Sequence, residues 1–177
     1  MTKTPLFAAM MLVGVTGAAH AGGSPGTLGV GAEFQIAGPG GASMNYDAGE
    51  FHVGGFLGFA DSDGDDNTVF TVGGRFFYHV HSTADADFGV GGSLGIVSAP
   101  DNGPNNDRAT LVYVEPGIQL RVFLAANVAL SASTGIVLGV VDADGVAITG
   151  SSGIGAVSVT TAGVGFGGGV GLHYYFF

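Results

Sequence analysis

The densest group of ligand-forming side chains in this sequence is the acidic run at residues 61–67, which reads Asp-Ser-Asp-Gly-Asp-Asp-Asn. Carboxylate oxygens at such short intervals are the ligands that hard cations such as Ca²⁺ take. An EF-hand loop also needs a glutamate at its twelfth position, which here holds Val72. We therefore interpret the run as a solvated acidic loop, with weak divalent-cation binding as the alternative. The shorter run Asp142-x-Asp144-Gly145 is a weaker candidate of the same kind.

Histidine and serine side chains are the next candidates for chemistry. His79 and His81 are two residues apart, which places them on one face of a strand, and His52 or His173 would have to complete an imidazole metal site. Amphipathic rings at the edge of an apolar surface are the simpler interpretation. A hydrolase would need a histidine beside a serine and an acid, but no local motif joins such residues. We expect no catalytic residue, no metal site and no cofactor.

The balance of charge and the absence of cysteine exclude several functions. After the first 21 residues only Arg75, Arg108 and Arg121 are basic, against 14 acidic residues in the chain. Nucleic-acid binding depends on basic surfaces, so we exclude nucleic acid as a partner. Since the chain has no cysteine, it has neither disulfides nor thiolate metal sites.

Residues 1–21 have the pattern of an export signal. Lys3 supplies the positive charge, residues 6–15 form an apolar stretch, and Ala19-His20-Ala21 is a small-residue cleavage site. The apolar stretch is too short to cross a bilayer as a helix. We predict a signal peptide over residues 1–21 and one mature domain over residues 22–177, with an uncleaved anchor as the alternative.

The remaining sequence alternates between bulky apolar residues and small or polar ones, which is the pattern of strands. The alternation predicts strands at 27–36, 42–48, 50–60, 68–80, 86–97, 109–123, 128–140 and 161–177. Gly49 predicts a tight reversal through a positive φ, and Pro116 cannot donate a ladder hydrogen bond in its strand. Short turns (47–49, 81–85, 124–127) alternate with long loops (61–67, 98–108, 141–160), with the first loop, 37–41, as the exception. The 35 glycines of the 177 residues follow this alternation and no triplet period, which excludes collagen.

The polarity of the two strand faces indicates a membrane. A soluble barrel would place its large apolar residues inside, whereas here the small and charged residues share the face opposite the bulky apolar ones. A sheet that spans a bilayer must close on itself, and bacterial barrels have an even number of strands with short turns at one end and long loops at the other. We predict an all-β, eight-stranded antiparallel up-and-down transmembrane β-barrel in the cell outer membrane of a Gram-negative bacterium. A secreted soluble β-sandwich is the alternative.

The lumen of such a barrel is just wide enough to be filled by side chains, so we expect no open pore. Buried charges there must be paired and hydrogen-bonded. We expect Arg75 and Arg121 each to contact a luminal acid, with Glu33 and Glu115 as members of these lumen ion pairs. A gated ion path or a ligand site is the alternative. The charges predicted to face the lumen are Glu33, Glu50, Arg75, Asp87, Glu115 and Arg121.

The end of the chain carries a family resemblance. The signal, the eight alternating strands and the terminal Gly171-x-x-Tyr174-x-Phe176-Phe177 resemble those of small OmpA/OmpX-like outer-membrane β-barrel proteins. The resemblance covers essentially the whole mature chain. It implies that Tyr174, Phe176 and Phe177 form the signal read by the outer-membrane barrel assembly machinery. It also implies a barrel domain without the peptidoglycan-binding domain of longer members.

The function that we expect from this resemblance is a structural role or binding through the long loops, not catalysis. The expected partners are outer-membrane lipid, lipopolysaccharide and the assembly machinery. Two enzyme types occur on eight-stranded barrels, and both act on lipopolysaccharide acyl chains. An enzyme of this kind is therefore the alternative.

Overall fold

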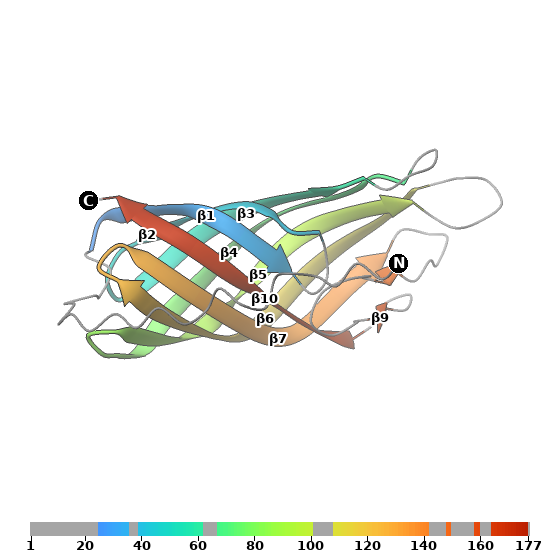
Figure 1. Ribbon diagram of the computed structural model, residues 1–177. Coiled ribbons are helices and arrows are strands. Elements are labelled where there is room, and N and C mark those ends of the chain that lie inside the picture. The colour runs from blue at the N-terminus through green and yellow to red at the C-terminus, as the bar shows by residue number, and fades with distance from the viewer. Residues whose placement is uncertain are drawn as a thin grey trace, which may run out of the picture.

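The computed structural model describes residues 25–35, 39–61, 67–100, 108–141, 148–149, 158–159 and 164–176. Eight antiparallel strands form a closed barrel in the order β1-β10-β7-β6-β5-β4-β3-β2 (Figure 1). Two short strands, β8 and β9, pair separately. Within the described ranges, no helix is long and apolar enough to cross a membrane. The strands are β1 (Thr27–Gln35), β2 (Gly41–Asp47), β3 (Phe51–Ala60), β4 (Val69–Ser82), β5 (Ala86–Pro100), β6 (Arg108–Ala125), β7 (Val128–Val141), β8 (Ile148–Thr149), β9 (Ser158–Val159) and β10 (Val164–Phe176).

The predicted eight-stranded antiparallel barrel is confirmed, and the strand boundaries lie within a few residues of those predicted. The loop predicted at 98–108 is shorter than expected, because β5 continues to Pro100 and β6 begins at Arg108. Arg108 holds this extension against the neighbouring wall, since its Nη2 donates to the Thr68 carbonyl oxygen at 2.8 Å. The predicted signal peptide at 1–21 and the terminal Phe177 lie outside the described residues.

The short turns lie at the same end of the barrel as the C-terminal end of β10, and the strand ends that flank the longer connections lie at the opposite end (Figure 1). We call these the turn end and the loop end.

The β2–β3 turn depends on Asp47 and Gly49. Gly49 has a φ of 90°, which favours glycine, and its N–H donates to Asp47 Oδ1 at 2.7 Å. The predicted positive φ at Gly49 is therefore confirmed.

The outer face of the barrel is apolar on every strand. Its side chains include Phe34 and Phe166, which are 68% and 74% exposed, and the other outward positions are mostly leucine, valine, isoleucine and aromatic residues. Soluble monomers rarely expose contiguous apolar surface of this extent. The alternation predicted from the sequence thus points bulky apolar side chains outward.

A band of low bulk, which we call the waist, runs around this outer face. It consists of four cross-strand pairs, which join β1 to β2, β3 to β4, β5 to β6 and β7 to β10. The residue of each new pair does not lie directly opposite the preceding pair in the ladder. It lies closer to the turn end on its own strand. Leu57, for example, lies opposite Ala42, and Gly55 is two residues closer to the turn end. Because barrel strands are tilted, this step keeps the pairs at a similar level. The pairs are Ala32–Ala42, Gly55–Gly74, Gly92–Pro116 and Thr134–Gly168, of which Gly168 is itself buried.

Glycines on the inner face make room for large luminal side chains. Tyr113 lies directly opposite Gly95 in the β5–β6 ladder, and its ring occupies the space that a side chain at Gly95 would need. The Phe56–Gly73 and Tyr175–Gly29 pairs have the same arrangement. A narrow barrel cannot hold two bulky side chains at one level, so an aromatic residue on one strand requires a small one on the next. This pairing explains much of the high glycine content.

We expect the substitution Gly95→Ala to destabilise the barrel by about 1–3 kcal/mol, because it overpacks the lumen. A Cβ at this position would lie 2.9 Å from the Tyr113 hydroxyl oxygen. Gly74→Ala is the matched control, since its Cβ would point outward and lie 3.5 Å from the nearest atom. Urea unfolding of the reconstituted barrel measures both free energies. Equal stability of the two variants would contradict the proposed packing.

Candidate functional site

The charged and polar side chains that face the lumen gather at two levels. The mid-lumen cluster consists of Glu33, Gln35, Arg75, Ser93 and Glu115. The turn-end cluster consists of Asp47, His52, His79, Asp87, Arg121 and Tyr175. Nearly all of these side chains are buried, and the members of each cluster come from several strands on opposite walls. Closure of the sheet therefore brings them together.

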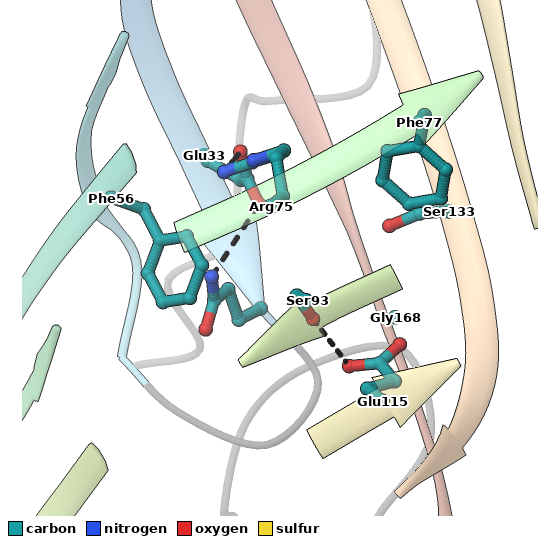
Figure 2. Close-up of a pocket in the computed structure, with 9 residues that line it drawn as sticks. Glu33, Phe56, Arg75, Phe77, Ser93, Glu115, Ser133 and Gly168 are labelled. Carbon is teal, nitrogen blue, oxygen red and sulfur yellow. Dashed lines mark hydrogen bonds and ion pairs between the residues drawn. The ribbon is translucent and has the colours of Figure 1, made fainter. Parts of the chain in front are cut away.

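An ion pair across the lumen organises the mid-lumen cluster (Figure 2). Arg75 Nη2 on β4 contacts Glu33 Oε2 on β1, and the two side chains are only 3% and 5% exposed. Strands β1 and β4 are not neighbours in the sheet, so the pair joins two opposite parts of the wall. The ring of Phe56 covers the guanidinium, with its centroid 5.2 Å from Arg75 Cζ. The aromatic face adds a favourable cation–π contact in a desolvated setting.

Glu115 belongs to the same cluster but contacts no arginine among the described residues, so its predicted membership of an ion pair is not seen. Arg75, Ser93 and Glu115 occupy one row across β4, β5 and β6, and Ser93 lies between the two charges. Ser93 Oγ donates to Glu115 Oε2 at 3.2 Å. The carboxylate lies over Gly135 and Gly167, where an added Cβ would come within 2.9 Å and 2.8 Å of Glu115 atoms. The register of the ladders therefore places Ser93 beside Glu115. Arg75 pairs instead with Glu33 on the other side of the lumen.

The space left beside these side chains is small. A cavity of about 10 Å³ is bordered by Glu33, Gln35, Arg75 and Glu115 together with Phe56 and Phe77. This volume accommodates roughly one water molecule. Toward the loop end, the inward side chains become apolar and form a buried cluster that consists of Phe56, Val97, Ala99, Ala109, Leu111, Tyr113 and Val137.

Arg121 is the centre of the turn-end cluster. Its Nη2 lies 2.5 Å from Asp47 Oδ2 and 2.6 Å from Asp87 Oδ2, and its Nη1 donates to the Tyr175 hydroxyl at 3.1 Å. Asp87 lies opposite Arg121 in the β5–β6 ladder, whereas Asp47 reaches it from β2 across the lumen. The ring centroid of Phe123 lies 4.9 Å from the guanidinium carbon. One buried cation therefore ties together β2, β5, β6 and β10.

Asp47 is the luminal charge that the sequence analysis did not include. It is 0% exposed, and besides Arg121 it accepts the turn hydrogen bond from Gly49. Its position on the same strand face as Ser43 and Asn45 was the available signal. Glu50, which we predicted to face the lumen, is exposed in the β2–β3 turn instead. Only its backbone contributes, since the Glu50 carbonyl accepts from the His79 N–H at 2.7 Å.

Two histidines extend the turn-end cluster as a hydrogen-bonded pair. His52 Nδ1 lies 2.8 Å from His79 Nε2, and His79 Nδ1 lies 2.7 Å from the Gly49 carbonyl oxygen. A carbonyl only accepts, so Nδ1 of His79 carries a proton, and its Nε2 accepts from His52 Nδ1 and from Arg121 Nη2, which lies 3.4 Å away. The contacts between the two imidazoles and the turn backbone hold this end of β3 and β4 together.

The predicted placement of His79 and His81 on one strand face is wrong. A β-bulge shifts the register between them, so that His79 pairs with Gly89 while His81 pairs with the outward-facing Phe88. His79 is therefore buried and His81 is exposed. Within the described ranges, no group of three or more histidine, aspartate or glutamate side chains is arranged to hold a metal ion.

The structure also forms a serine–histidine contact that the sequence did not suggest. Ser43 Oγ and His173 Nε2 lie 2.6 Å apart, although the residues are 130 positions apart in the chain. The two residues are 5% and 1% exposed and face the lumen. Their contact joins β2 to β10 through the interior, away from the outer face that an acyl chain would contact.

The remaining sequence candidates lie at the two ends of the barrel. Asp61 accepts a hydrogen bond from Thr68 Oγ1 at 3.1 Å, but residues 62–66 lie outside the described residues, so cation binding at 61–67 stays a prediction. Tyr174 and Phe176 are exposed on the outer face at the turn end, and their ring centroids are 5.0 Å apart. Phe177, the third residue of the expected assembly signal, is not in the described part of the chain.

Comparisons with known proteins identify the fold. No protein-family model matches the chain, and a search of curated proteins finds no match. Among solved structures, the chain is similar to the N-terminal β-barrel domain of Pseudomonas aeruginosa OprF, with a TM-score of 0.59 and 13% sequence identity. The match covers 86% of this chain and 98% of that domain. The chain therefore shares the eight-stranded β-barrel fold of that domain, as its alternating pattern predicts.

The mid-lumen ion pair gives a stability prediction. Arg75→Met leaves Glu33 as an uncompensated buried charge, which we expect to cost about 3–5 kcal/mol. The double variant Arg75→Met/Glu33→Gln removes that charge as well and should recover most of the loss. Urea unfolding in lipid vesicles gives the free energies, and Glu50→Gln, which removes an exposed charge outside the lumen, is the control. A double variant that is no more stable than Arg75→Met alone would contradict a direct pairing.

Proposed function

We propose that this chain is an integral outer-membrane protein whose role is structural or is carried by binding at its loops, with a lumen filled by side chains and no open pore. The observation that carries this proposal is the polarity of the closed barrel. Its outer face is apolar on all eight strands, while Arg75, Arg121 and their carboxylate partners lie inside.

The free energy of this outer face supports the proposed membrane location. Apolar surface left in water costs roughly 25 cal/mol per Å², so a barrel with such an exterior is favourable only in an apolar environment. Closure of the sheet supports the same location, because the ladder hydrogen bonds are satisfied within the barrel wall. The likeness to the OprF barrel domain agrees with an outer-membrane fold.

The absence of an open pore is inferred from the contents of the lumen. The cavity beside Glu33 and Glu115 has a volume of about 10 Å³, and a buried apolar cluster around Leu111 and Val137 lies between it and the loop end. Ions do not pass an apolar layer of packed side chains, because their hydration could not be replaced there. A structural or loop-binding role needs no path through the barrel.

The alternatives receive less support. The closed barrel is not a β-sandwich. An enzyme acting on lipopolysaccharide acyl chains needs its serine and histidine on a surface that those chains reach, but Ser43 and His173 are buried in the lumen. We propose outer-membrane lipid, lipopolysaccharide and the barrel assembly machinery as partners. Weak divalent-cation binding at 61–67 is a further proposal.

The first test is expression of the full chain in a Gram-negative host, followed by electrophoresis of the outer-membrane fraction with and without boiling. We expect a band whose mobility changes on boiling, because a closed barrel stays compact until heated. Planar-bilayer recordings of the purified barrel should show no steady channel. A soluble periplasmic protein would overturn the membrane proposal, whereas sustained unitary conductance would overturn the closed lumen.

The assembly signal is tested by the double variant Tyr174→Ala/Phe176→Ala. If these outward aromatics are read by the assembly machinery, we expect a several-fold loss of the heat-modifiable form. Phe166→Ala is the matched control, since it removes another exposed aromatic residue from the same strand at its loop end. An equal loss in both variants would indicate a general effect on the strand and not a recognition signal.

A further inference from the structure

The outer face carries a groove over β1, β2, β3 and β4, at the level of the waist. Its volume is about 370 Å³, which lies within the range of roughly 300–1,000 Å³ that small-molecule sites have. The outward side chains that border it are Val30, Ala42, Met44, Gly55, Leu57 and Val72.

Register and side-chain size explain the groove. Val30, Met44 and Gly55 lie in one row across β1, β2 and β3, and Ala42, Leu57 and Val72 lie in the next row across β2, β3 and β4. Each row places two branched or long side chains beside one small residue. Gly55 and Gly73 both line the groove and carry no side chain, so part of its floor is bare backbone between apolar side chains.

The chemistry of the lining selects an apolar ligand. None of the lining residues is charged, and Ser43 is the one with a polar side chain. That hydroxyl is engaged inside the barrel, where Ser43 Oγ contacts His173 Nε2 at 2.6 Å. Strand addition is also excluded here, because β1 to β4 are each paired on both sides in the closed barrel.

We propose that this groove is a preferred site for one acyl chain of a bilayer lipid, a proposal that rests on the membrane location proposed above. The groove is continuous with the apolar face that would contact the bilayer. A flexible methylene chain that lies in it contacts apolar side chains on both sides and the floor, whereas on a convex stretch of wall it contacts one side only. The added dispersion contacts favour the groove over the rest of the wall.

The test is photocrosslinking with a phosphatidylcholine that carries a diazirine in its acyl chain, in vesicles that contain the reconstituted full-length barrel. Labelled positions are mapped by mass spectrometry of peptides. We expect labelling at Met44 and Leu57 to exceed that at Leu120 and Leu138, similarly exposed outward residues of β6 and β7, by several-fold. Gly55→Leu should fill the groove and reduce labelling there to the level of β6 and β7.

Two features of the chain allow the labelling of the Gly55→Leu variant to be compared with that of the wild type. A Cβ at Gly55 would lie 3.6 Å from the nearest atom, so a side chain can begin at this position without a clash with the backbone. Ala132→Leu is the matched control, because it places the same leucine side chain at an exposed outward position on β7, away from the groove. Labelling of Met44 and Leu57 in this control should equal that of the wild type.

The opposing outcomes separate the groove from the membrane location. Uniform labelling around an inserted, heat-modifiable barrel would overturn the acyl-chain site and leave the membrane proposal intact. Crosslinks from the groove to a second barrel would overturn the choice of a lipid occupant. A chain that does not associate with vesicles and is labelled nowhere would overturn both proposals.

Discussion

Closure of eight strands into one narrow barrel is the constraint on which the other features depend. The enclosed space admits about one large side chain at each level, so the inner face must alternate bulk with glycine. Tyr113 over Gly95 and Phe56 over Gly73 satisfy this condition in adjacent strands. The same narrowness brings charges on opposite walls within contact distance, which an open sheet would keep apart.

The two buried arginines use this proximity to tie the wall together. Arg75 joins β4 to β1, and Arg121 joins β6 to β2, β5 and β10. Each guanidinium has carboxylate oxygens as partners and an aromatic ring over its face. Desolvating these charges is costly, so the pairs stabilise only the one arrangement in which every partner is in place. Together they link early and late strands that the sheet ladders join only through their neighbours.

The outer face is under a different constraint. Its side chains must be apolar, but their size is not limited by side chains on an opposite wall. Bulky residues are accepted at almost every outward position, yet the waist carries only alanine, glycine, proline or threonine. Where the waist passes between Met44 and Leu57, it becomes the groove to which we assign an acyl chain. Specificity on such a surface arises from the shape of the wall, because the outer face offers almost no hydrogen-bonding side chains to a ligand.

The sequence by itself determined the strands, their two faces and the barrel class, because the alternation of side chains along a strand is a local property of the backbone. It placed Arg75 and Arg121 inside for the same reason. Only the tertiary structure decided their partners. Arg121 takes Asp47 from across the lumen, Glu115 takes Ser93, and Ser43 meets His173, because register and closure set which inward positions share a level. The bulge that turns His81 outward shows the same limit, since a one-residue shift in pairing moves a side chain to the other face without a trace in the local pattern.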